Sequence, residues 1–512
     1  MAKRTATDSA NTADESQKFP RASGSGIPRD THTNGEMGEF EDAFEDEIES
    51  DEDVVDADGD NMDDMNDGMD VDEVLPAIEE SDEQPAAPET YIHGTHKLGP
   101  GEILEPDDSV YIMRHSLKVT WPCLSFDILR DNLGDERQKL PATAYLATGT
   151  QADTAQGNEL LVYKMSSLHR TQKDGDSDSD ADDDDDDDGD HLDEDPVLEY
   201  RSVPHHGGIN RVRAQPLTSL GPVSQPYHVA TWADTGKVHI WDVRPLIESL
   251  DVPGYSLDKD RVHKPVFTVN AHGRAEGFAL DWATSSHSST RLLTGDTYGK
   301  IFLTTSTPTG FNTFAQPFLS HTSSVEDIQW SPSEAFVFAS CSADRTIQIW
   351  DVRAKGRKSI AGVDAAHDSD VNVISWNKIN SYLLLSGGDD GGLKTWDLRN
   401  VKKREDGGPA SVPLASFNWH QGPITSVEWH PTEDSIFAAA GDDDQVTMWD
   451  LGVEQDDEEM GTNTSSQDVP PQLLFVHQGQ QHIKEVHWHA QIPGAVVSTA
   501  YDGFNIFKTI SV

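Results

Sequence analysis

The sequence contains few cysteines and no long apolar run. Cys123 and Cys341 are the two cysteines among 512 residues, and both lie in apolar, strand-like segments. Two thiols supply no disulfide framework, so we expect buried core residues in a reducing compartment. No segment approaches the roughly 20 consecutive apolar residues of a membrane-spanning helix, and the N-terminus lacks the apolar stretch of a secretion signal. The sequence therefore predicts a protein that has no membrane partner and is not secreted.

Basic residues are missing from two tracts that hold much of the acidic charge. Residues 36–89 contain 25 Asp and Glu, and residues 174–195 contain 15, without any Lys or Arg. These 40 residues explain most of the formal net charge of −54, so the rest of the chain carries −14. Such blocks repel themselves and cannot bury a core. We predict that residues 1–90 form a disordered acidic N-terminal tail and that residues 174–195 form a disordered acidic insertion.

A repeated strand ending dominates the remainder. Trp-Asp-Val-Arg stands at 241–244 and 350–353, Trp-Asp-Leu-Arg at 396–399, and Trp-Asp-Leu at 449–451. The spacing of about 40–55 residues per unit, after short apolar runs that alternate in polarity, is typical of WD repeats. The pattern predicts an all-β fold in which residues 121–512 form a seven-bladed WD40 β-propeller. Residues 453–471 then form a further acidic insertion, between the sixth and seventh blades.

Residues 91–120 are predicted to form an N-terminal segment with a short docking helix. Residues 105–109 supply N-cap candidates and acidic charge, and Val110, Met113 and Leu117 recur at helical spacing. We expect the inner face of this helix to pack against the rim of the propeller. A strand from one terminus usually completes the blade at the other terminus, and we expect residues 91–105 or the C-terminus to do so.

Four of the predicted blades carry a His, an Asp and a Trp in the same order. Buried side chains of these types can satisfy one another through hydrogen bonds, often with a Ser or Thr. A His with an Asp and a hydroxyl is similar to a hydrolase triad, but a catalytic site would not recur in blade after blade. We therefore predict a structural network and no enzyme activity. The predicted network residues are His206, Asp234, Trp241, His321, Asp344, Trp350, His367, Asp390, Trp396, His420, Asp443 and Trp449.

Motifs for cofactors and metals are incomplete. Residues 295–300 contain Gly-Lys but lack the spacing of a phosphate loop, and residues 56–61 lack the glycine of a calcium loop. The histidines within 482–489 could ligate a metal, but His489 stands at the repeat position of His430, so a repeat explains it better. The sequence predicts no catalytic residue, no cofactor and no metal.

Two segments resemble a known family. Tyr-Ile-Met-Arg-His-Ser-Leu at 111–117 and Thr-Trp-Pro-Cys-Leu-Ser-Phe at 120–126 are similar to the N-terminal helix and first strand of the histone-binding WD-repeat proteins of chromatin-assembly complexes. The loop at 470–477 is similar too. Within that superfamily, the acidic tracts and the ending Asp-Gly-Phe-Asn-Ile-Phe-Lys at 502–508 resemble the glutamate-rich WD-repeat proteins, which are chaperones of ribosome assembly. The resemblance covers residues 91–512.

This resemblance implies a dedicated chaperone for a newly made basic ribosomal protein of the large subunit, of the L-three type. Such a chaperone masks the RNA-binding surface of its client and delivers it for 60S ribosome biogenesis, in the nucleus and nucleolus with a cytoplasmic pool. Pre-60S particles and histones are further partners that the resemblance suggests, and no direct contact with nucleic acid is expected. In the wider family a basic helix lies between the N-terminal helix and the acidic loop before the last blade. The residues expected to bind the client are therefore Asp107, Asp108, Tyr111, Asp182, Asp183, Asp184, Asp185, Asp186, Asp187, Asp188, Glu454, Asp456, Asp457, Glu458 and Glu459.

Two other functions stay open. A histone chaperone would use the same acidic chemistry and the same groove. A substrate receptor of a cullin-type ubiquitin ligase is suggested by Arg353 and Arg399, which match the Trp-Asp-x-Arg signature of such receptors. An arginine that closes the loop at the end of a blade explains these residues more simply, because the same ending recurs throughout the superfamily.

Overall fold

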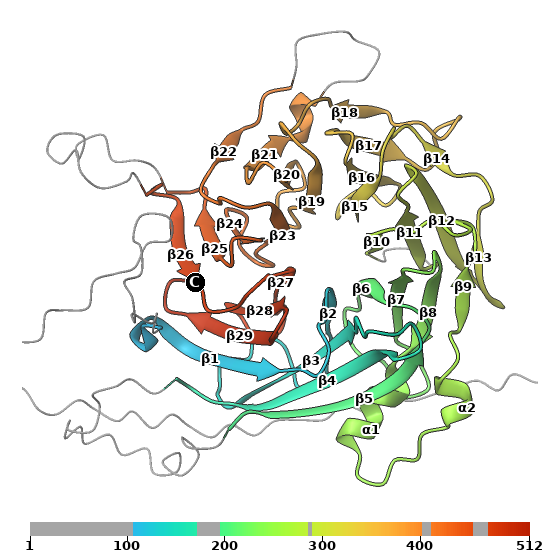
Figure 1. Ribbon diagram of the computed structural model, residues 1–512, viewed down its shortest axis with the longest axis vertical. Coiled ribbons are helices and arrows are strands. Elements are labelled where there is room, and N and C mark those ends of the chain that lie inside the picture. The colour runs from blue at the N-terminus through green and yellow to red at the C-terminus, as the bar shows by residue number, and fades with distance from the viewer. Residues whose placement is uncertain (1–105, 172–194, 285–288, 402–410, 454–468) are drawn as a thin grey trace, which may run out of the picture. The chain divides into compact units, whose positions relative to one another are not determined.

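The computed structural model describes residues 106–171, 195–284, 289–401, 411–453 and 469–512. In these residues seven antiparallel sheets follow one another in a ring (Figure 1). The predicted all-β fold, a seven-bladed propeller of WD repeats, is confirmed. None of the helices in these ranges is long and apolar enough to span a membrane.

Blades 1 to 4 follow in chain order, and the strands of each run from the innermost to the outermost. Blade 1 has β2 (Phe126–Leu129), β3 (Ala142–Gly149), β4 (Asn158–Leu168) and β5 (Val197–His205). Blade 2 has β6 (Ile209–Ala214), β7 (His228–Ala233), β8 (Val238–Asp242) and β9 (Phe267–Val269). Blade 3 has β10 (Ala279–Trp282), β11 (Arg291–Gly295), β12 (Lys300–Thr307), β13 (Gly310–Thr313) and β14 (Phe318–Leu319). Blade 4 has β15 (Val325–Trp330), β16 (Val337–Ser342), β17 (Ile347–Asp351) and β18 (Ala361–Val363).

Blades 5 to 7 complete the ring. Blade 5 has β19 (Val371–Trp376), β20 (Leu383–Gly388), β21 (Leu393–Asp397) and β22 (Ala415–Phe417). Blade 6 has β23 (Ile424–Trp429), β24 (Ile436–Gly441), β25 (Val446–Asp450) and β26 (Leu473–His477). Blade 7 has β27 (Glu485–Trp488), β28 (Ala495–Ala500), β29 (Gly503–Thr509) and, outermost, β1 (Tyr111–Lys118). The described helices are short: α1 (Arg244–Asp251), α2 (Lys259–Val262) and the 3₁₀ helices η1 (Asp108–Val110) and η3 (Leu398–Asn400).

The core lies between neighbouring blades. At the boundary of blades 3 and 4, Trp330, Phe338 and Trp350 pack on Leu293 and Ile301. Phe338 and Trp350 are fully buried and stack with their ring centroids 5.6 Å apart. Full burial of one large apolar side chain contributes roughly 1.5–3 kcal/mol. Because each blade buries its apolar faces against its two neighbours, the fold is complete only when the last blade meets the first.

The ring closes through β1, which is the outermost strand of the C-terminal blade. β1 pairs antiparallel with β29 from Tyr111, opposite Thr509, to Lys118, opposite Gly503. Met113 is fully buried between blades 7 and 1. The N-terminal part of the chain thus completes the last blade, and the strand that does so is residues 111–118. Residues 91–105, where this strand was expected, lie outside the described residues.

The predicted docking helix is wrong. η1 makes a single 3₁₀ turn, and the residues assigned to the helix continue as β1. Val110, Met113 and Leu117 fit a helical spacing, but the buried residues Tyr111, Met113 and Leu117 are all an even number of residues apart and fit a strand equally well. Pairing with β29 selects the strand, because tertiary contacts override weak local preferences.

Candidate functional site

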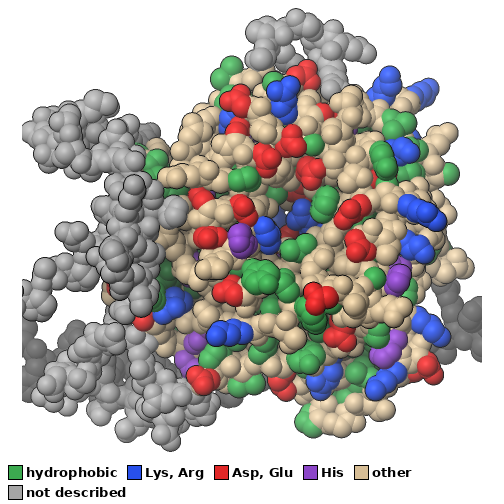
Figure 2. All heavy atoms as spheres, viewed as in Figure 1, with side chains coloured by type: hydrophobic (Ala, Val, Ile, Leu, Met, Phe, Trp, Pro, Cys, Tyr) green, Lys and Arg blue, Asp and Glu red, His purple; other side chains and the backbone are tan. Residues whose placement is uncertain are grey.

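The centre of the ring holds a cavity of about 300 Å³, the central channel, which is lined by both charged and apolar side chains. Its walls are the inner strands of the blades and the connections that follow them, such as Lys378 after β19. Figure 2 shows a hollow at the middle of the ring with acidic and basic side chains around it. Because the cavity reaches the connections between first and second strands, it opens on the face of the ring that carries those connections.

The inner strands are joined by side chains that accept backbone hydrogen bonds across blade boundaries. Each inner strand pairs on one side only, so some N–H groups on its channel edge have no strand partner. The Asp281 carboxylate accepts the N–H of Trp330 at 2.7 Å, and the Gln329 amide oxygen accepts the N–H of Trp376 at 2.8 Å. The same kind of bond joins other neighbours, with these acceptors: Ser125, Asp127, Asp327, Ser375, Ser426, Glu428 and Glu485.

Glu485 is the centre of a buried ion network that spans the closure of the ring. Its carboxylate, 1% exposed, lies 2.9 Å from Arg211 and 2.7 Å from Arg213 of blade 2, and it accepts the N–H of Phe126 in blade 1. Burial disfavours the charged carboxylate, but Arg213, His487 and Arg211 outweigh it and hold the pKa of Glu485 well below its usual value. One side chain of the last blade therefore binds both of the first two blades.

His487 lies between Glu485 and a second carboxylate. Its Nδ1 is 3.0 Å from Glu428 and its Nε2 is 3.6 Å from Glu485. Burial disfavours the imidazolium, but Glu428 and Glu485 together raise the pKa of His487 to about 10. His487 is therefore a cation at neutral pH.

Away from the channel, three of the four predicted His, Asp and Trp sets are brought together by the fold. In blade 4, His321 Nδ1 lies 2.9 Å from Asp344, His321 Nε2 lies 2.7 Å from Ser340 Oγ, and the Trp350 indole N–H donates to Ser340 at 2.8 Å. In blade 5 the hydrogen bonds run from Asp390 through His367 and Ser386 to Trp396. In blade 6 they run from Asp443 through His420 and Thr447 to Trp449.

The fourth set needs a correction. In blade 2, His205 and not His206 lies inside the blade, with its Nε2 3.1 Å from Thr231 Oγ1, to which the Trp241 indole also donates. His206 and Asp234 are both exposed, and His205 Nδ1 contacts the carbonyl oxygen of Gly207 in place of an aspartate. Because His205 and His206 are adjacent, the repeat pattern alone did not show which of them belongs to the network. Strand alternation along β5 favours His205, because Val203 is buried on the same face.

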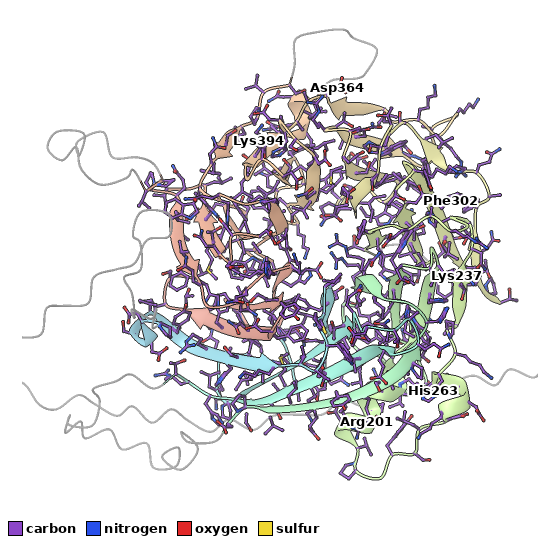
Figure 3. The ribbon with its side chains drawn as sticks, in the orientation of Figure 1. Arg201, Lys237, His263, Phe302, Asp364 and Lys394 are labelled. Carbon is purple, nitrogen blue, oxygen red and sulfur yellow. The ribbon has the colours of Figure 1, made fainter. Side chains whose placement is uncertain are left out.

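Two further networks were missed in the sequence. In blade 3, His272 contacts Asp296 at 2.9 Å and Thr294 at 2.7 Å. Thr304 stands in the place of the tryptophan, and the ring of Phe302 (labelled in Figure 3) packs edge-on against the ring of His272. His272 and Asp296 are 24 residues apart, close to the 23 residues between the His and the Asp in blades 4 to 6, so their spacing in the sequence could have revealed this pair. In blade 7, His477 Nδ1 lies 2.8 Å from the hydroxyl of Tyr111, which stands in for the aspartate.

The predicted client-binding residues fall into three groups. Asp107 and Asp108 are at the start of the described chain, where Asp107 caps η1 by accepting the N–H of Ser109, and Asp108 pairs with Arg114 at 2.8 Å. The prediction of Tyr111 as a client contact is wrong, because its ring is 5% exposed and packs against Phe475 and Phe507. The remaining residues, Asp182 to Asp188, Glu454, Asp456, Asp457, Glu458 and Glu459, lie outside the described residues.

The fold gathers the attachment points of the three acidic segments. The N-terminal acidic tail precedes β1, the acidic insertion 174–195 precedes β5, and the acidic part of 453–471 precedes β26. These are the outermost strands of blades 7, 1 and 6, which are consecutive in the ring (Figure 1). In an antiparallel four-stranded blade, the connection before the outermost strand lies on the same face as the connection after the innermost strand. The three segments therefore join the ring on one side and on the face where the cavity opens.

The two arginines of the Trp-Asp-x-Arg endings lie on the same face but are engaged. Arg353 donates to the Asp351 carboxylate through two nitrogens and lies over the ring of Phe336. Arg399 does the same with Asp397 and Tyr382. Both stay about 60% exposed, so they close the blade ends and still present a charged surface.

No group of three or more His, Cys, Asp or Glu side chains in the described ranges could hold a metal ion. Cys123 and Cys341 are buried free thiols. What the site provides is a channel lined by charged and apolar side chains, with acidic segments attached beside it.

Comparison with protein families places the sequence near histone-binding WD-repeat proteins. Residues 101–169 match the family model that describes histone-binding protein RBBP4 and its counterpart in the CAF1 complex. Residues 313–351, 360–397 and 411–450 match the model of the WD domain, G-beta repeat. The first match spans β1 and much of blade 1, and the others correspond to the regular blades 4 to 6.

Three similar proteins share most of the chain. Ribosome assembly protein rrb1 of Schizosaccharomyces pombe is 46% identical over 98% of this chain and 100% of its own length. Protein HEAT STRESS TOLERANT DWD 1 of Arabidopsis thaliana is 46% identical over 82% of this chain and 91% of its own length. Glutamate-rich WD repeat-containing protein 1 of Dictyostelium discoideum is 43% identical over 81% of this chain and 84% of its own length. The resemblance read from the motifs is thereby confirmed.

Proposed function

The chain belongs to the family of glutamate-rich WD-repeat proteins that includes ribosome assembly protein rrb1, and we propose that it is a non-catalytic chaperone in ribosome biogenesis. Its client is a newly made basic ribosomal protein of the large subunit, of the L-three type. It masks the RNA-binding surface of this client and delivers it to pre-60S particles. The nucleus and nucleolus, with a cytoplasmic pool, are the compartments in which this function is exerted.

The observation that carries the proposal is the common attachment of the three acidic segments to blades 6, 7 and 1. They are far apart in the sequence, yet they start from neighbouring points on one face. Electrostatic interactions are screened over about 8 Å at physiological ionic strength, so only acidic groups that lie near one another act on the same client surface. A basic client that meets this side of the ring encounters all three.

Polyacidic segments suit a client that must later bind RNA. Many weak carboxylate contacts can cover a basic surface without a fixed shape. Linking these contacts to a rigid ring raises their effective concentration, so weak contacts together hold a tight complex. Phosphate groups of rRNA compete for the same Lys and Arg side chains, which gives a route for release.

The His, Asp and hydroxyl networks support a binding role rather than catalysis. The rings of His321, His367 and His420 are fully buried. Each is bonded on one side to an aspartate and on the other to a hydroxyl that also receives a tryptophan N–H. A substrate has no access to such a group, so the networks hold the blades together.

The first test deletes the acidic tracts from the full chain. Removing residues 36–89 and 174–195 should weaken capture of the purified L-three type protein and should reduce the salt dependence of its Kd, while the melting temperature stays the same. Reversing Asp456, Asp457, Glu458 and Glu459 to Lys should act in the same direction. Unchanged affinity and an unchanged salt slope in both variants would contradict the proposal.

A matched control separates placement from net charge. Moving the acidic insertion 174–195 into residues 352–360, before β18 of blade 4, keeps the formal charge at −54 but shifts the segment to a distant blade. We expect this variant to bind the client nearly as weakly as the variant without the insertion. Full affinity would show that total charge alone is enough.

Histone binding is a second candidate, favoured by the family match over residues 101–169. Competition between histones and the ribosomal protein for the purified chain shows which of the two binds more tightly.

A role as a receptor of a ubiquitin ligase is a third candidate, favoured by the exposed Arg353 and Arg399 and by the name of the Arabidopsis relative. Copurification with ligase subunits that is lost in the Arg353→Ala, Arg399→Ala variant would support it.

A further inference from the structure

Two buried donors without an acceptor lie next to each other at the boundary of blades 3 and 4. Arg291, the first residue of β11, is 6% exposed, and Trp330, the last residue of β15, is 5% exposed. The Arg291 guanidinium carbon lies 4.7 Å from the centre of the Trp330 ring. Among the described residues, neither the Nε of Arg291 nor the indole N–H of Trp330 has a hydrogen-bond partner. Buried polar groups are normally paired, so two such donors together indicate a site for an acceptor.

The indole of Trp330 differs from its counterparts in the other blades. A tryptophan ends the inner strand in each of blades 3 to 7. In four of these blades the indole N–H donates to a backbone carbonyl oxygen: Trp282 to Arg213, Trp376 to Ser381, Trp429 to Ser375 and Trp488 to Glu428. The fold can therefore satisfy this donor, and at the boundary of blades 3 and 4 the described residues do not do so.

The Arg291 guanidinium also lacks a counterion. Within the described part of the chain it forms no ion pair, and it lies against the rings of Trp330 and Phe336, the second at 5.3 Å. Burial lowers the pKa of Arg291, and no neighbouring carboxylate offsets this effect. Residues 285–288, shortly before it in the sequence, are Ser-Ser-His-Ser and contain no acidic residue. A buried cation without an anion is disfavoured until a partner arrives.

The two donors lie just beneath the face on which the acidic segments are attached. Arg291 follows the connection between β10 and β11, and Phe336 belongs to the connection between β15 and β16. Phe336, 37% exposed, separates Arg291 from Arg353, whose guanidinium carbon lies 4.8 Å from the centre of the ring. The terminal nitrogens of Arg291 have no partner in the described part of the chain, and in contrast to Nε they are not fully buried. A ligand can therefore reach them from this face.

These donors select a carboxylate. A guanidinium and an indole N–H can only donate hydrogen bonds, so an apolar or cationic group would leave both unpaired. A carboxylate carries the missing negative charge, and its two oxygens can accept from two donors at once. An anion that arrives from solution is repelled by a chain whose charge outside the two acidic tracts is already −14. A carboxylate that is tethered to the ring has a high effective concentration and avoids this difficulty.

Length selects the N-terminal acidic tract, residues 36–89, as the source of the carboxylate. This part of the chain enters the ring at β1 in blade 7, and the boundary of blades 3 and 4 is opposite blade 7 in a ring of seven (Figure 1). Strands about 4.8 Å apart make a blade roughly 15 Å wide, so the path across two blades is about 30 Å in addition to the channel.

The tract is far enough from its point of attachment to cross this distance. Residues 89 and 36 precede residue 106, the first described residue, by 17 and 70 positions. A flexible chain of these lengths spans roughly 20–50 Å. The insertion 174–195 is attached at both ends, so its middle is about 11 residues from the ring and reaches only roughly 20 Å.

We propose that an Asp or Glu carboxylate of residues 36–89 binds the Arg291 guanidinium and the Trp330 indole N–H, and so docks the acidic tail of the chain on its own ring. This contact involves the chain alone and does not depend on the identity of the client. One guanidinium holds one carboxylate, so a client with many cations can still displace the tail. A protein with few cations has to compete with Arg291.

A spin label in the tail tests this contact in the full chain. Both native cysteines are buried, so Ser50→Cys provides one reactive thiol within the tract. A nitroxide at this position should broaden the indole N–H signal of Trp330, which is assigned by its loss in Trp330→Phe. Arg291→Met keeps the length of the side chain and its contact with the rings but removes the charge. It should lower the docking equilibrium constant about ten-fold, since hydrogen bonds to charged groups are worth a factor of this size, and the broadening should fall with it.

Two further variants control for net charge and for folding. Arg357, in the connection before β18, also lies over an aromatic ring, that of Phe318 at 4.9 Å. Arg357→Met is the matched control, because it removes one charge from the same face and should leave the broadening unchanged. Replacing the 25 Asp and Glu of residues 36–89 by Asn and Gln leaves the ring unaltered and should abolish the broadening. If Arg291→Met lowers the melting temperature, this neutral tail decides the test alone.

Equal broadening in Arg291→Met and in the labelled parent chain would overturn the inference, as would broadening that persists with the neutral tail. Absence of broadening in the parent chain would overturn it as well. In that case a shift of the Trp330 signal on addition of N-acetyl-glutamate amide would assign the site to a carboxylate of another molecule. No client is present in these measurements, so each of these results leaves the proposed function intact.

Discussion

Replacing Glu485 by Gln should destabilise the ring more than most single substitutions. Glu485 is the carboxylate through which blade 7 binds blades 1 and 2. Glutamine has the same shape and keeps an oxygen that can accept the N–H of Phe126. It removes the charge, however, so Arg211 and Arg213 lose their partner while they remain largely buried, at 13% and 16% exposed. The protonated His487 loses one of its two carboxylates as well.

The magnitude follows from the charges left without a partner. Removing one member of a buried ion pair costs about 3–5 kcal/mol, because the desolvation of the remaining charge is no longer compensated. The partial exposure of the two arginines lets water reach them, which favours the lower end of that range. We therefore expect a loss of about 3 kcal/mol in the free energy of unfolding.

Denaturant unfolding monitored by tryptophan fluorescence measures this loss. The control is Glu334→Gln, an exposed glutamate at the turn between β15 and β16, which should cause no measurable change. A cost below about 1 kcal/mol for Glu485→Gln would refute the reasoning, because it would place the network among surface ion pairs.

The same variant has a pH signature. The pKa of His487 is raised from 6.5 to about 10, so its interactions with Glu428 and Glu485 contribute fully below pH 6.5 and are lost as the pH rises to about 10. The wild type should therefore lose stability across this range. In Glu485→Gln the folded-state pKa of His487 falls, so the loss should still begin near pH 6.5 but should be smaller and should end at a lower pH. Identical alkaline profiles of the two proteins would argue against a cationic His487.

Three further predictions concern the blades. Tyr111→Phe leaves His477 Nδ1 without its partner and should lower the free energy of unfolding by about 1–3 kcal/mol. Tyr298→Phe, at an exposed turn, is the control and should have no effect. Equal melting temperatures for the two variants would contradict the network in blade 7. Ser386→Ala breaks the link from His367 to Trp396 and should cost about 1–3 kcal/mol in denaturant unfolding without changing client affinity. Arg353→Ala removes an exposed ion pair and should leave the melting temperature unchanged.

The regular blades could be predicted because their sequence repeats. Blades 4 to 6 keep His, Asp and Trp at nearly constant spacing, so each copy supports the interpretation of the others. Blade 3 has Thr304 where the tryptophan is expected, and its network was overlooked for that reason. In blade 2 the tryptophan was correct but the histidine was shifted by one residue, because only the side of β5 that faces the core distinguishes His205 from His206.

The closure of the ring could not be read from local sequence. The buried side chains of residues 111–117 fit the alternation of a strand, and an overlapping set of apolar residues fits the spacing of a helix. The choice depends on β29, almost 400 residues later, which offers an unpaired edge. The same long-range pairing brings Tyr111 to His477, so its assignment as a client contact failed together with the helix.

The channel was not predicted for a related reason. The residues that line it, such as Asp127, Asp281 and Glu428, come from different blades and share no motif in the sequence. They stand at equivalent places on the inner strands, where each side chain reaches the N–H of the next blade. A position that needs only a hydrogen-bond acceptor can be Asp, Glu, Gln or Ser. This freedom lets charged side chains line the channel without loss of the ring.

The same positions hold the ring together and place charge in its channel. The acceptor that joins two blades is the neutral Ser375 at one boundary and the charged Asp281 at another. Because serine or glutamine suffices to join the blades, the fold does not require a charge at these positions. Every long acidic segment joins the ring on the side that opens to this channel, so a client drawn to those segments arrives at its entrance.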